Sequence, residues 1–432
     1  MPSQMFHLGF FLGGFRVPAW NQPWSGTSSR DWSDGMFYVD LARAFERACF
    51  DYFMIEDSNY IPDDYGDSME VYLKLGHRAP KHDPAILAAQ ISQYTKSLGI
   101  VATVATSETT PFHLARLISS LDHLSHGRIG WNMVTGSSDH AAQNFGRKGQ
   151  LPHDERYDVA DEFVSVVTKL WDSWDQDAVI LDEKSGYYID HTKVRVLDYR
   201  GKYFASRGPS VALPPVQSRP VLCQAGVSPR GLKFTARHSD TVIATANGPD
   251  GMKAVRDQIR THAVEAGRDP NSIKVMFLVR PIIGETEEDA QHRARMDAAD
   301  RKRQLEMSLS NLASNTMLDF SKFDLDEPLP KDVTTNGHSG MLVNMVNSGK
   351  TLRQIGEDSV GMPLVGTPGS LAAQMDEAMQ HIGGDGFLLT HMWPTRRYVD
   401  EICDGLVPAL QARGLVRTAY EFPTFRENLH AF

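Results

Sequence analysis

Short runs of apolar residues alternate along this chain with longer segments in which apolar residues recur every three to four positions. A short apolar run bounded by turn residues predicts a β-strand, and the longer period predicts an amphipathic helix. Strands are predicted at residues 5–11, 52–55, 98–103, 128–134, 220–224, 241–245, 273–283 and 385–390. Helices are predicted at 35–49, 84–94, 111–123, 154–174, 249–266, 286–307, 367–381 and 396–413, and one more begins at residue 228.

This order of strand then helix, repeated eight times, favours a parallel sheet. An open doubly wound sheet is the alternative, but eight units that close on themselves fit a (β/α)8 TIM barrel better. We therefore predict one barrel domain over residues 1–432, with insertions at 58–82, 175–218 and 308–361. Because structureless loops longer than about 15 residues in a compact domain are usually functional or disordered, we expect the last insertion to act as a lid. A surface or dimer-contact excursion is the alternative.

Composition and charge exclude several classes of function. Apolar residues make up 41% and charged residues 23% of the chain, as in ordinary globular proteins. The formal net charge of −10 argues against nonspecific nucleic-acid binding. The three cysteines form no CxxC pair and no disulfide framework, which favours a reduced, cytoplasmic setting. The N-terminal segment has no basic region and no long apolar run, so we expect neither a signal peptide nor a membrane span.

Polar residues follow several of the predicted strands directly. They are Glu56, Asp57 and Ser58 after the second strand, Thr103, Thr106, Ser107 and Glu108 after the third, Asn132, Thr135, Gly136, Ser137 and Ser138 after the fourth, and Ala225, Gly226, Val227 and Ser228 after the fifth. In a TIM barrel the C-terminal ends of the strands carry the site, so these clusters would meet on one rim. Any one of these residues alone reads equally well as a helix cap, but four clusters favour a ligand site.

Two segments suit a phosphate group. Gly226 lets the backbone approach a ligand, and the amides of Val227 and Ser228 would be free donors at a helix start. His153 and Tyr157 are four residues apart, so they share one face of another helix start and both can donate to phosphate oxygens. A surface capping segment is the plainer interpretation of the second pair.

Motifs for other chemistries are missing from the sequence. It contains no GxGxxG after the first strand, no GxxxxGK[ST] and no GxSxG. His77 and His82 are five residues apart and lack a matching frame of carboxylates, so no metal site is expected.

At these same segments the chain resembles a known family. The stretches GWNMVTG (130–136), HDERYD (153–158) and QAGVS (224–228) occur in the order typical of the bacterial-luciferase-like flavin monooxygenases. The resemblance covers nearly the whole chain and is strongest to the nitrilotriacetate and dibenzothiophene-sulfone monooxygenase branch. It implies a (β/α)8 barrel that binds FMN at the strand ends, and a separate NAD(P)H-dependent reductase that supplies FMNH2.

The resemblance also assigns residues to the cofactor. The contacts it implies for the flavin ring and ribityl chain are Asp57, Thr103, Asn132 and Gly136, and those for the phosphate are His153, Tyr157, Val227 and Ser228. The chain departs from the family in two places. The loop after the first strand reads Gly13-Gly14-Phe15-Arg16 where many relatives carry Cys or His, and Ser137 stands where some relatives carry His. The substrate pocket has therefore diverged.

Our hypothesis from the sequence is a two-component monooxygenase of the flavin C4a-(hydro)peroxide type, which uses FMNH2 and O2 on a small organic substrate. His140 and Ser137 are the candidates for a catalytic base close to the ring. The aromatic residues near the N-terminus, including Trp20 and Trp24, favour a heteroaromatic substrate. A deazaflavin-dependent oxidoreductase on the same barrel and a non-catalytic flavin-binding protein are the alternatives. We also expect a homodimer or homotetramer.

Overall fold

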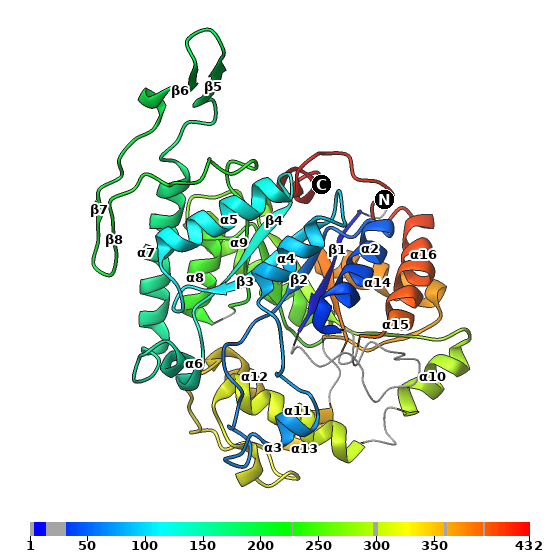
Figure 1. Ribbon diagram of the computed structural model, residues 1–432. Helices are drawn as coiled ribbons and strands as arrows, with labels where there is room; N and C mark the ends of the chain where they lie inside the picture. The colour runs from blue at the N-terminus through cyan, green and yellow to red at the C-terminus, as the bar shows by residue number, and fades with distance from the viewer. Residues whose placement is uncertain (1–3, 14–31, 227, 297–300, 358–360, 392–393) are drawn as a thin grey trace.

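The computed structural model describes residues 4–13, 32–226, 228–296, 301–357, 361–391 and 394–432. Eight parallel strands form a closed barrel in the order β1-β14-β11-β10-β9-β4-β3-β2, and helices surround it (Figure 1). The strands are β1 (His7–Leu12), β2 (Tyr52–Ile55), β3 (Gly99–Ala105), β4 (Ile129–Val134), β9 (Val221–Gln224), β10 (Thr241–Ala244), β11 (Lys274–Val279) and β14 (Gly386–Thr390). The predicted (β/α)8 barrel is confirmed.

A helix follows each strand and packs on the outside of the barrel. These helices are α2 (Met36–Arg47), α4 (Pro84–Ser92), α5 (Pro111–Leu124), α7 (His153–Trp171), α8 (Pro229–His238), α9 (Gly248–Glu265), α14 (Pro368–Ile382), and the run of α15 (Arg396–Asp400), η5 (Glu401–Leu406) and α16 (Val407–Ala412). Four of them begin with the same local motif, an N-cap residue whose side chain accepts a backbone hydrogen bond, followed by proline. The pairs are Asp83-Pro84, Thr110-Pro111, Ser228-Pro229 and Thr367-Pro368. Proline at the first helical position has no N–H to leave unpaired, so the sequence fixes these starts locally.

Apolar side chains fill the barrel interior. They are Tyr52, Met54, Val101, Val221, Cys223, Ile243, Met276 and Leu388. The short C-terminal helix α17 (Phe425–Leu429) adds Phe425 and Leu429 and closes the end where the strands begin. Gly99 makes room for it, since a Cβ there would lie 2.6 Å from the Phe425 ring. A ligand site is therefore expected at the opposite end, where the strands finish.

The strand predicted at 273–283 is too long, because the structure divides it into two strands. It breaks at Arg280, and β12 (Pro281–Ile283) leaves the barrel to pair with β13 (Leu364–Gly366) in a separate two-stranded sheet. Pro281 offers no N–H for a barrel ladder, which suits a break at this point. The predicted helix at 286–307 is also two helices, α10 (Glu287–Met296) and α11 (Arg301–Thr316).

Two of the insertions form one body over the open end of the barrel, in the lower part of Figure 1. It contains α3 (Glu70–Lys74), α11, η4 (Phe320–Lys322), α12 (Ser339–Asn347) and α13 (Leu352–Glu357). The hydroxyls of Tyr60 and Tyr72 donate to the carbonyls of Ser314 (2.9 Å) and Ser310 (2.8 Å) and join the two insertions. The body has its own apolar core of Leu305, Leu309, Ala313, Phe320, Leu329, Leu342, Met345 and Leu352. The 308–361 insertion is therefore a small helical layer and not an irregular loop.

The remaining insertion, residues 175–218, projects from the barrel as an arm, in green at the upper left of Figure 1. It carries two hairpins, β5 (Val179–Asp182) with β6 (Tyr187–Ile189) and β7 (Tyr199–Arg200) with β8 (Ala205–Ser206). At its base Trp174 Nε1 donates to the carbonyl of Ser210 at 2.7 Å. Over the part of the chain that the structure describes, no helix has the length and apolar character needed to cross a membrane.

Candidate functional site

The residues assigned to a flavin from the sequence lie at the ends of four strands that are neighbours in the barrel. Asp57 follows β2, Thr103 lies in β3, Asn132 lies in β4, and Ser228 follows β9. Because the barrel order is β2, β3, β4, β9, these positions form one continuous arc on the rim. The sequence order alone does not show this, since the arm separates β4 from β9.

Asn132 offers a buried acceptor on this arc. Its Nδ2 donates to Thr103 Oγ1 at 2.9 Å, and both side chains are buried. Its Oδ1 is buried and finds no hydrogen-bond partner among the residues that the structure describes. A buried amide oxygen left unpaired costs free energy, so this atom indicates a place where a ligand N–H or O–H is received.

A second group of unpaired polar atoms surrounds Gly136. This glycine has φ +75°, and a Cβ on it would lie 2.5 Å from Gln150 Nε2 and 2.7 Å from Ser107 Oγ. The hydroxyl of Ser107 and both ends of the Gln150 amide are buried, and within the described part of the chain they have no hydrogen-bond partner. Ser107 belongs to the clusters found in the sequence, whereas Gln150 was missed because it follows no strand and matches no motif.

Asp57 stands among other charged groups. Its Oδ1 accepts from the backbone N–H of Ser58 at 2.8 Å, and Lys81 Nζ donates to Ser58 Oγ at 2.7 Å. Burial raises the pKa of Asp57 to about 7, although the positive charge of the nearby Lys81 acts in the opposite direction and lowers this pKa. The neighbouring Glu56 pairs with Arg78 at 2.8 Å. Asp57 therefore changes its protonation state close to neutral pH.

The predicted phosphate-binding residues come together at the start of α8. Ser228 caps this helix by accepting from the Gly231 amide at 3.1 Å, and its Oγ lies 3.3 Å from His153 Nε2. The His153 and Tyr157 rings lie edge to face, with centroids 5.3 Å apart. A Cβ on Gly226 would lie only 2.5 Å from the Tyr157 hydroxyl, so glycine at this position lets the tyrosine approach the backbone. Val227 lies outside the described residues.

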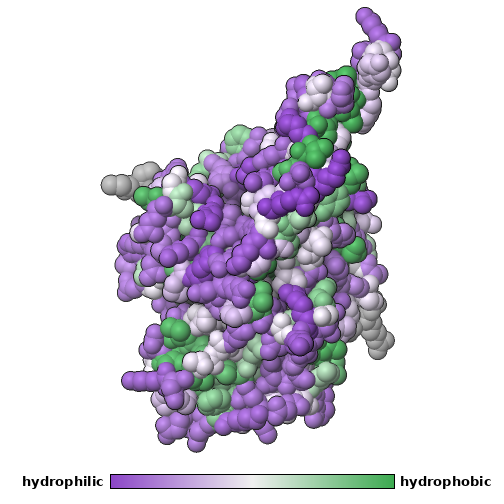
Figure 2. Space-filling model, turned by 90° about the vertical axis from the view of Figure 1, so that its left-hand side faces the viewer, coloured by the Kyte–Doolittle hydropathy of each residue, from purple (hydrophilic) through white to green (hydrophobic). Residues whose placement is uncertain are grey.

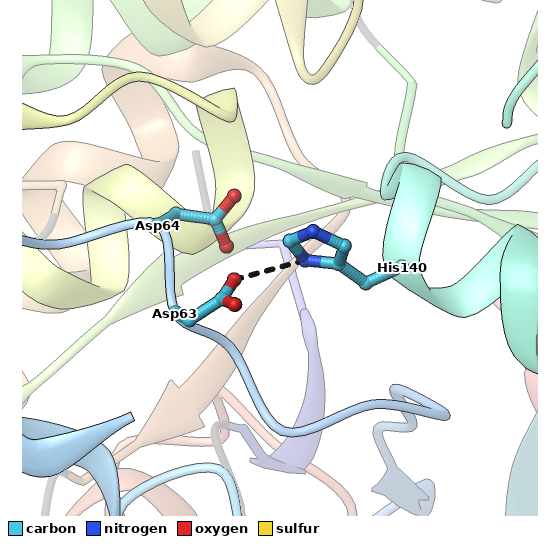
Figure 3. Close-up of side chains that lie close together, drawn as sticks. All are labelled: Asp63, Asp64 and His140. Carbon is cyan, nitrogen blue, oxygen red and sulfur yellow. Dashed lines mark ion pairs between the residues drawn. The ribbon is translucent and has the colours of Figure 1, made fainter. Parts of the chain in front are cut away.

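The candidate base His140 lies on the side of the rim next to the 58–82 insertion. Its Nδ1 lies 3.0 Å from Asp63 Oδ1, and Asp64 stands beside the pair (Figure 3). One ligand atom from each of the three residues lies within 4.8 Å of the other two, so the structure places two carboxylates around His140 that the sequence prediction missed. Burial raises the pKa of Asp64 to about 6. Ser137 lies half-buried between Gly136 and the α6 (Asp139–Asn144) cap Ser138.

The comparison with protein families matches residues 14–386 to the model described as "Luciferase-like monooxygenase". The chain belongs to the luciferase-like monooxygenase family. As a member of that family it is an FMN-dependent monooxygenase that uses O2, and the family resemblance found in the sequence is confirmed.

Relatives in this family match over almost their full length. The chain is 36% identical to the dibenzothiophene-sulfone monooxygenase of Rhodococcus erythropolis (strain XP), over 99% of this chain and 96% of that protein. It is 31% identical to nitrilotriacetate monooxygenase component A of Aminobacter aminovorans, again over 99% and 96%. The solved structure of a riboflavin lyase with modified FMN and riboflavin superposes with a TM-score of 0.89 at 31% identity, covering 99% and 96%.

The residues on the rim fit FMN as this luciferase-like family member's cofactor. The unpaired Asn132 Oδ1 can accept a hydrogen bond from an N–H group of a polar ring system. The α8 start, with the Ser228 hydroxyl and the neighbouring His153 and Tyr157, suits a phosphate dianion, because helix starts attract anions. FMN carries both groups on one molecule.

Proposed function

We propose that this chain is the oxygenase component of a two-component monooxygenase, which receives FMNH2 from a separate NAD(P)H-dependent reductase and oxidises a small organic substrate. The observation that carries the proposal is the arc from Asp57 through Asn132 to Ser228, with a buried, unpaired acceptor at its centre. The name of the Aminobacter relative, nitrilotriacetate monooxygenase component A, supports a separate partner, as does the lack of a nicotinamide-binding motif in the sequence.

In this proposal each part of the rim has one task. His153, Tyr157 and Ser228 hold the phosphate, and Asp57, Thr103, Asn132 and Gly136 contact the ring and ribityl chain. Bound reduced FMN supplies the electrons that activate O2. His140 and Ser137 handle a proton near the substrate, and the helical body over the mouth keeps water from the ring.

We propose a planar, heteroaromatic molecule as the substrate. Two of the relatives that match over nearly their whole length support this class, since one is named for dibenzothiophene sulfone and another is solved with riboflavin as its substrate. The members named for alkanes, dimethyl sulfide and nitrilotriacetate supply the competing classes.

A screen that couples the enzyme to a flavin reductase, NADH and FMN tests this proposal. Dibenzothiophene sulfone, riboflavin, a linear alkane, dimethyl sulfide and nitrilotriacetate would each be added, with oxygen uptake measured after subtraction of hydrogen peroxide. Product formation with a planar heterocycle supports the proposed class. Turnover of only the alkane, the sulfide or the aminopolycarboxylate rejects the class but leaves the two-component mechanism standing.

The alternative of a deazaflavin-dependent oxidoreductase has support at the level of the fold alone. The solved F420-dependent secondary alcohol dehydrogenase shares 17% identity and a TM-score of 0.58 with this chain. Titration with FMN and with the deazaflavin cofactor separates the two functions, because only one should bind at micromolar concentration. A chain that binds FMN but takes up no oxygen with any substrate would favour a non-catalytic flavin-binding protein.

A further inference from the structure

Positive charge is buried where the barrel rim meets the helical body. Arg78 and Arg156 are 7% and 4% exposed, and the side chain of Lys81 is 11% exposed. Hydrophilic side chains cover most of the face drawn in Figure 2, and the whole chain has a net charge of −10. Cations that are buried rather than solvated need anions close by to balance them.

The carboxylates at the rim balance this charge only in part. Glu56 accepts from Arg78 Nη1 at 2.8 Å and lies 3.6 Å from Lys81 Nζ, so two cations share one carboxylate. Asp57 is only half ionised at neutral pH, because its pKa lies at about 7. The rim therefore carries an excess of positive charge even before Arg156 is counted.

Arg156 has no carboxylate partner within the part of the chain that the structure describes. Its guanidinium donates to the carbonyls of Leu151 at 2.9 Å and Asn336 at 2.8 Å, which are both uncharged. The Nε atoms of Arg156 and Arg78 are buried, and neither finds a hydrogen-bond partner among the described residues. A buried donor without an acceptor costs free energy, so the two arginines offer N–H groups to an incoming anion.

His338 stands next to both arginines, at the start of α12. Its backbone N–H donates to the carbonyl of Asn315 at 2.9 Å, and Asn315 Oδ1 accepts from Arg78. Its side chain is accessible, yet burial, together with the charges of Arg78 and Arg156, lowers the pKa of the imidazole to about 4. A side chain that is accessible and closely surrounded at the same time lines a recess and not the outer surface. At neutral pH His338 is therefore an uncharged donor in this recess.

We propose that this recess binds an acidic group of the substrate, so that the substrate is a planar aromatic compound that carries a carboxylate or a similar anion. Arg78 and Arg156 balance the charge of that group, and the imidazole N–H of His338 donates to one of its oxygens. The start of α12 adds the positive end of the helix dipole, since the His338 side chain does not cap this helix. The inference rests on the proposed oxygenase function, because it names the substrate class of that same site.

The phosphate of FMN is a second anion, and its proposed place is different. That place is the α8 start, where Ser228 Oγ lies 3.3 Å from His153 Nε2. Arg156 lies on α7, as His153 does, but its hydrogen bond to Asn336 joins it to the helical body and not to α8. We therefore expect the recess to remain available when FMN is bound.

Isothermal titration calorimetry of the full chain saturated with FMN tests the proposal, with benzoate and benzamide as probes. The two probes have similar planar shapes, but only benzoate is charged. We expect the parent to bind benzoate about tenfold more tightly than benzamide, a ratio that one hydrogen bond to a charged group supports. His338→Phe and Arg78→Met should each lower this ratio by about threefold or more and leave the affinity for FMN unchanged.

His113→Phe and Arg195→Met are the matched controls, because both residues are exposed and lie on α5 and on the arm. They should keep the ratio of the parent. If Arg78→Met does not fold, His338→Phe decides, because the imidazole of His338 makes no side-chain hydrogen bond to any described residue that its loss would break.

Equal affinity of the parent for benzoate and benzamide overturns the proposal, and so does a His338→Phe variant with the ratio of the parent. Variants that lose FMN affinity but keep the ratio also overturn it and assign the buried cations to the cofactor. These outcomes are separate from the proposed function. A parent that selects benzoate, but whose flavin is reduced by NADH alone, would reject the two-component mechanism and leave the anion-binding recess standing.

Discussion

Arg156 joins the helix that carries His153 and Tyr157 to the helical body over the mouth of the barrel. Its Nη2 donates to the carbonyl of Asn336 at 2.8 Å, and its Nη1 lies 3.2 Å from Asn336 Oδ1. Arg156 is buried, and Asn336 lies just before α12. The helix proposed to hold the phosphate and the body proposed to exclude water are therefore tied together by one side chain.

From these two hydrogen bonds we predict that Arg156→Met uncouples NADH consumption from substrate oxidation. Without the two hydrogen bonds, the segment before α12 should open more often, and water should reach the ring before the substrate is oxidised. We expect hydrogen peroxide to rise severalfold per NADH consumed, and amide exchange at 336–347 to accelerate. Arg195→Met, which breaks an exposed ion pair on the arm, is the control. If coupling and exchange both stay at the level of the parent, the body does not gate the site.

The proposed phosphate-binding residues His153, Tyr157 and Ser228 predict a selective loss of FMN affinity when they are substituted. Ser228→Ala combined with Tyr157→Phe should weaken FMN binding by roughly 1–3 kcal/mol in total, the scale of hydrogen bonds to a charged group. Riboflavin, which lacks the phosphate, should bind the variant and the parent alike. Thr367→Ala is the control, because Thr367 caps α14 ahead of a proline as Ser228 caps α8. Unchanged FMN affinity in the double variant would show that Ser228 and Tyr157 do not bind the phosphate.

The raised pKa of Asp57 predicts that binding of reduced FMN depends on pH. With a pKa of about 7, the Asp57 carboxyl is neutral below pH 7 and ionised above it. Its negative charge then opposes the anionic cofactor, so affinity should fall as the pH rises from about 6 to 8. A like-charge interaction of about 1 kcal/mol corresponds to roughly a fivefold loss. Anaerobic fluorescence titrations measure it, and Asp57→Asn should remove the dependence. An equally steep pH profile in Asp57→Asn would assign the titration to another group.

The pair of His140 and Asp63 predicts a loss in turnover without a loss of cofactor. His140→Gln should lower kcat at least tenfold and leave FMN affinity unchanged, because general bases typically contribute 10²- to 10⁴-fold. His113→Gln, on the exposed side of α5, is the control. Dialysis against a chelator should not alter the parent's kcat, since we expect no metal at the site. A kcat that survives in His140→Gln, or one that the chelator abolishes and Mg²⁺ restores, would contradict this role.

Local sequence signals were sufficient for the barrel and for most of the rim. Cap-and-proline pairs such as Ser228-Pro229 define helix starts without any tertiary information, and the period of apolar residues defines which face is buried. Asn132 and Thr103 were found because parallel strands bring their ends to a common rim.

Contacts between distant segments account for what the sequence did not reveal. Asp63 and His140 lie 77 positions apart, and Arg156 and Asn336 lie 180 apart, so no local pattern joins either pair. The lid hypothesis also changes in its details. Leu342 and Met345 of the 308–361 insertion fill the core of the helical body itself, so these side chains do not cover a ligand. A deletion from Asn336 to Lys350 would therefore damage that core, and Arg156→Met is the cleaner test.

The central claim is that FMNH2 reaches this enzyme from another protein. Stopped-flow mixing of the FMN-loaded chain with NADH tests it most directly, with flavin absorbance followed in the absence and presence of a flavin reductase. We expect the absorbance to stay constant with NADH alone and to bleach within seconds once the reductase is added. Rapid bleaching by NADH without the reductase would show that this chain reduces its own flavin, and would contradict the two-component mechanism.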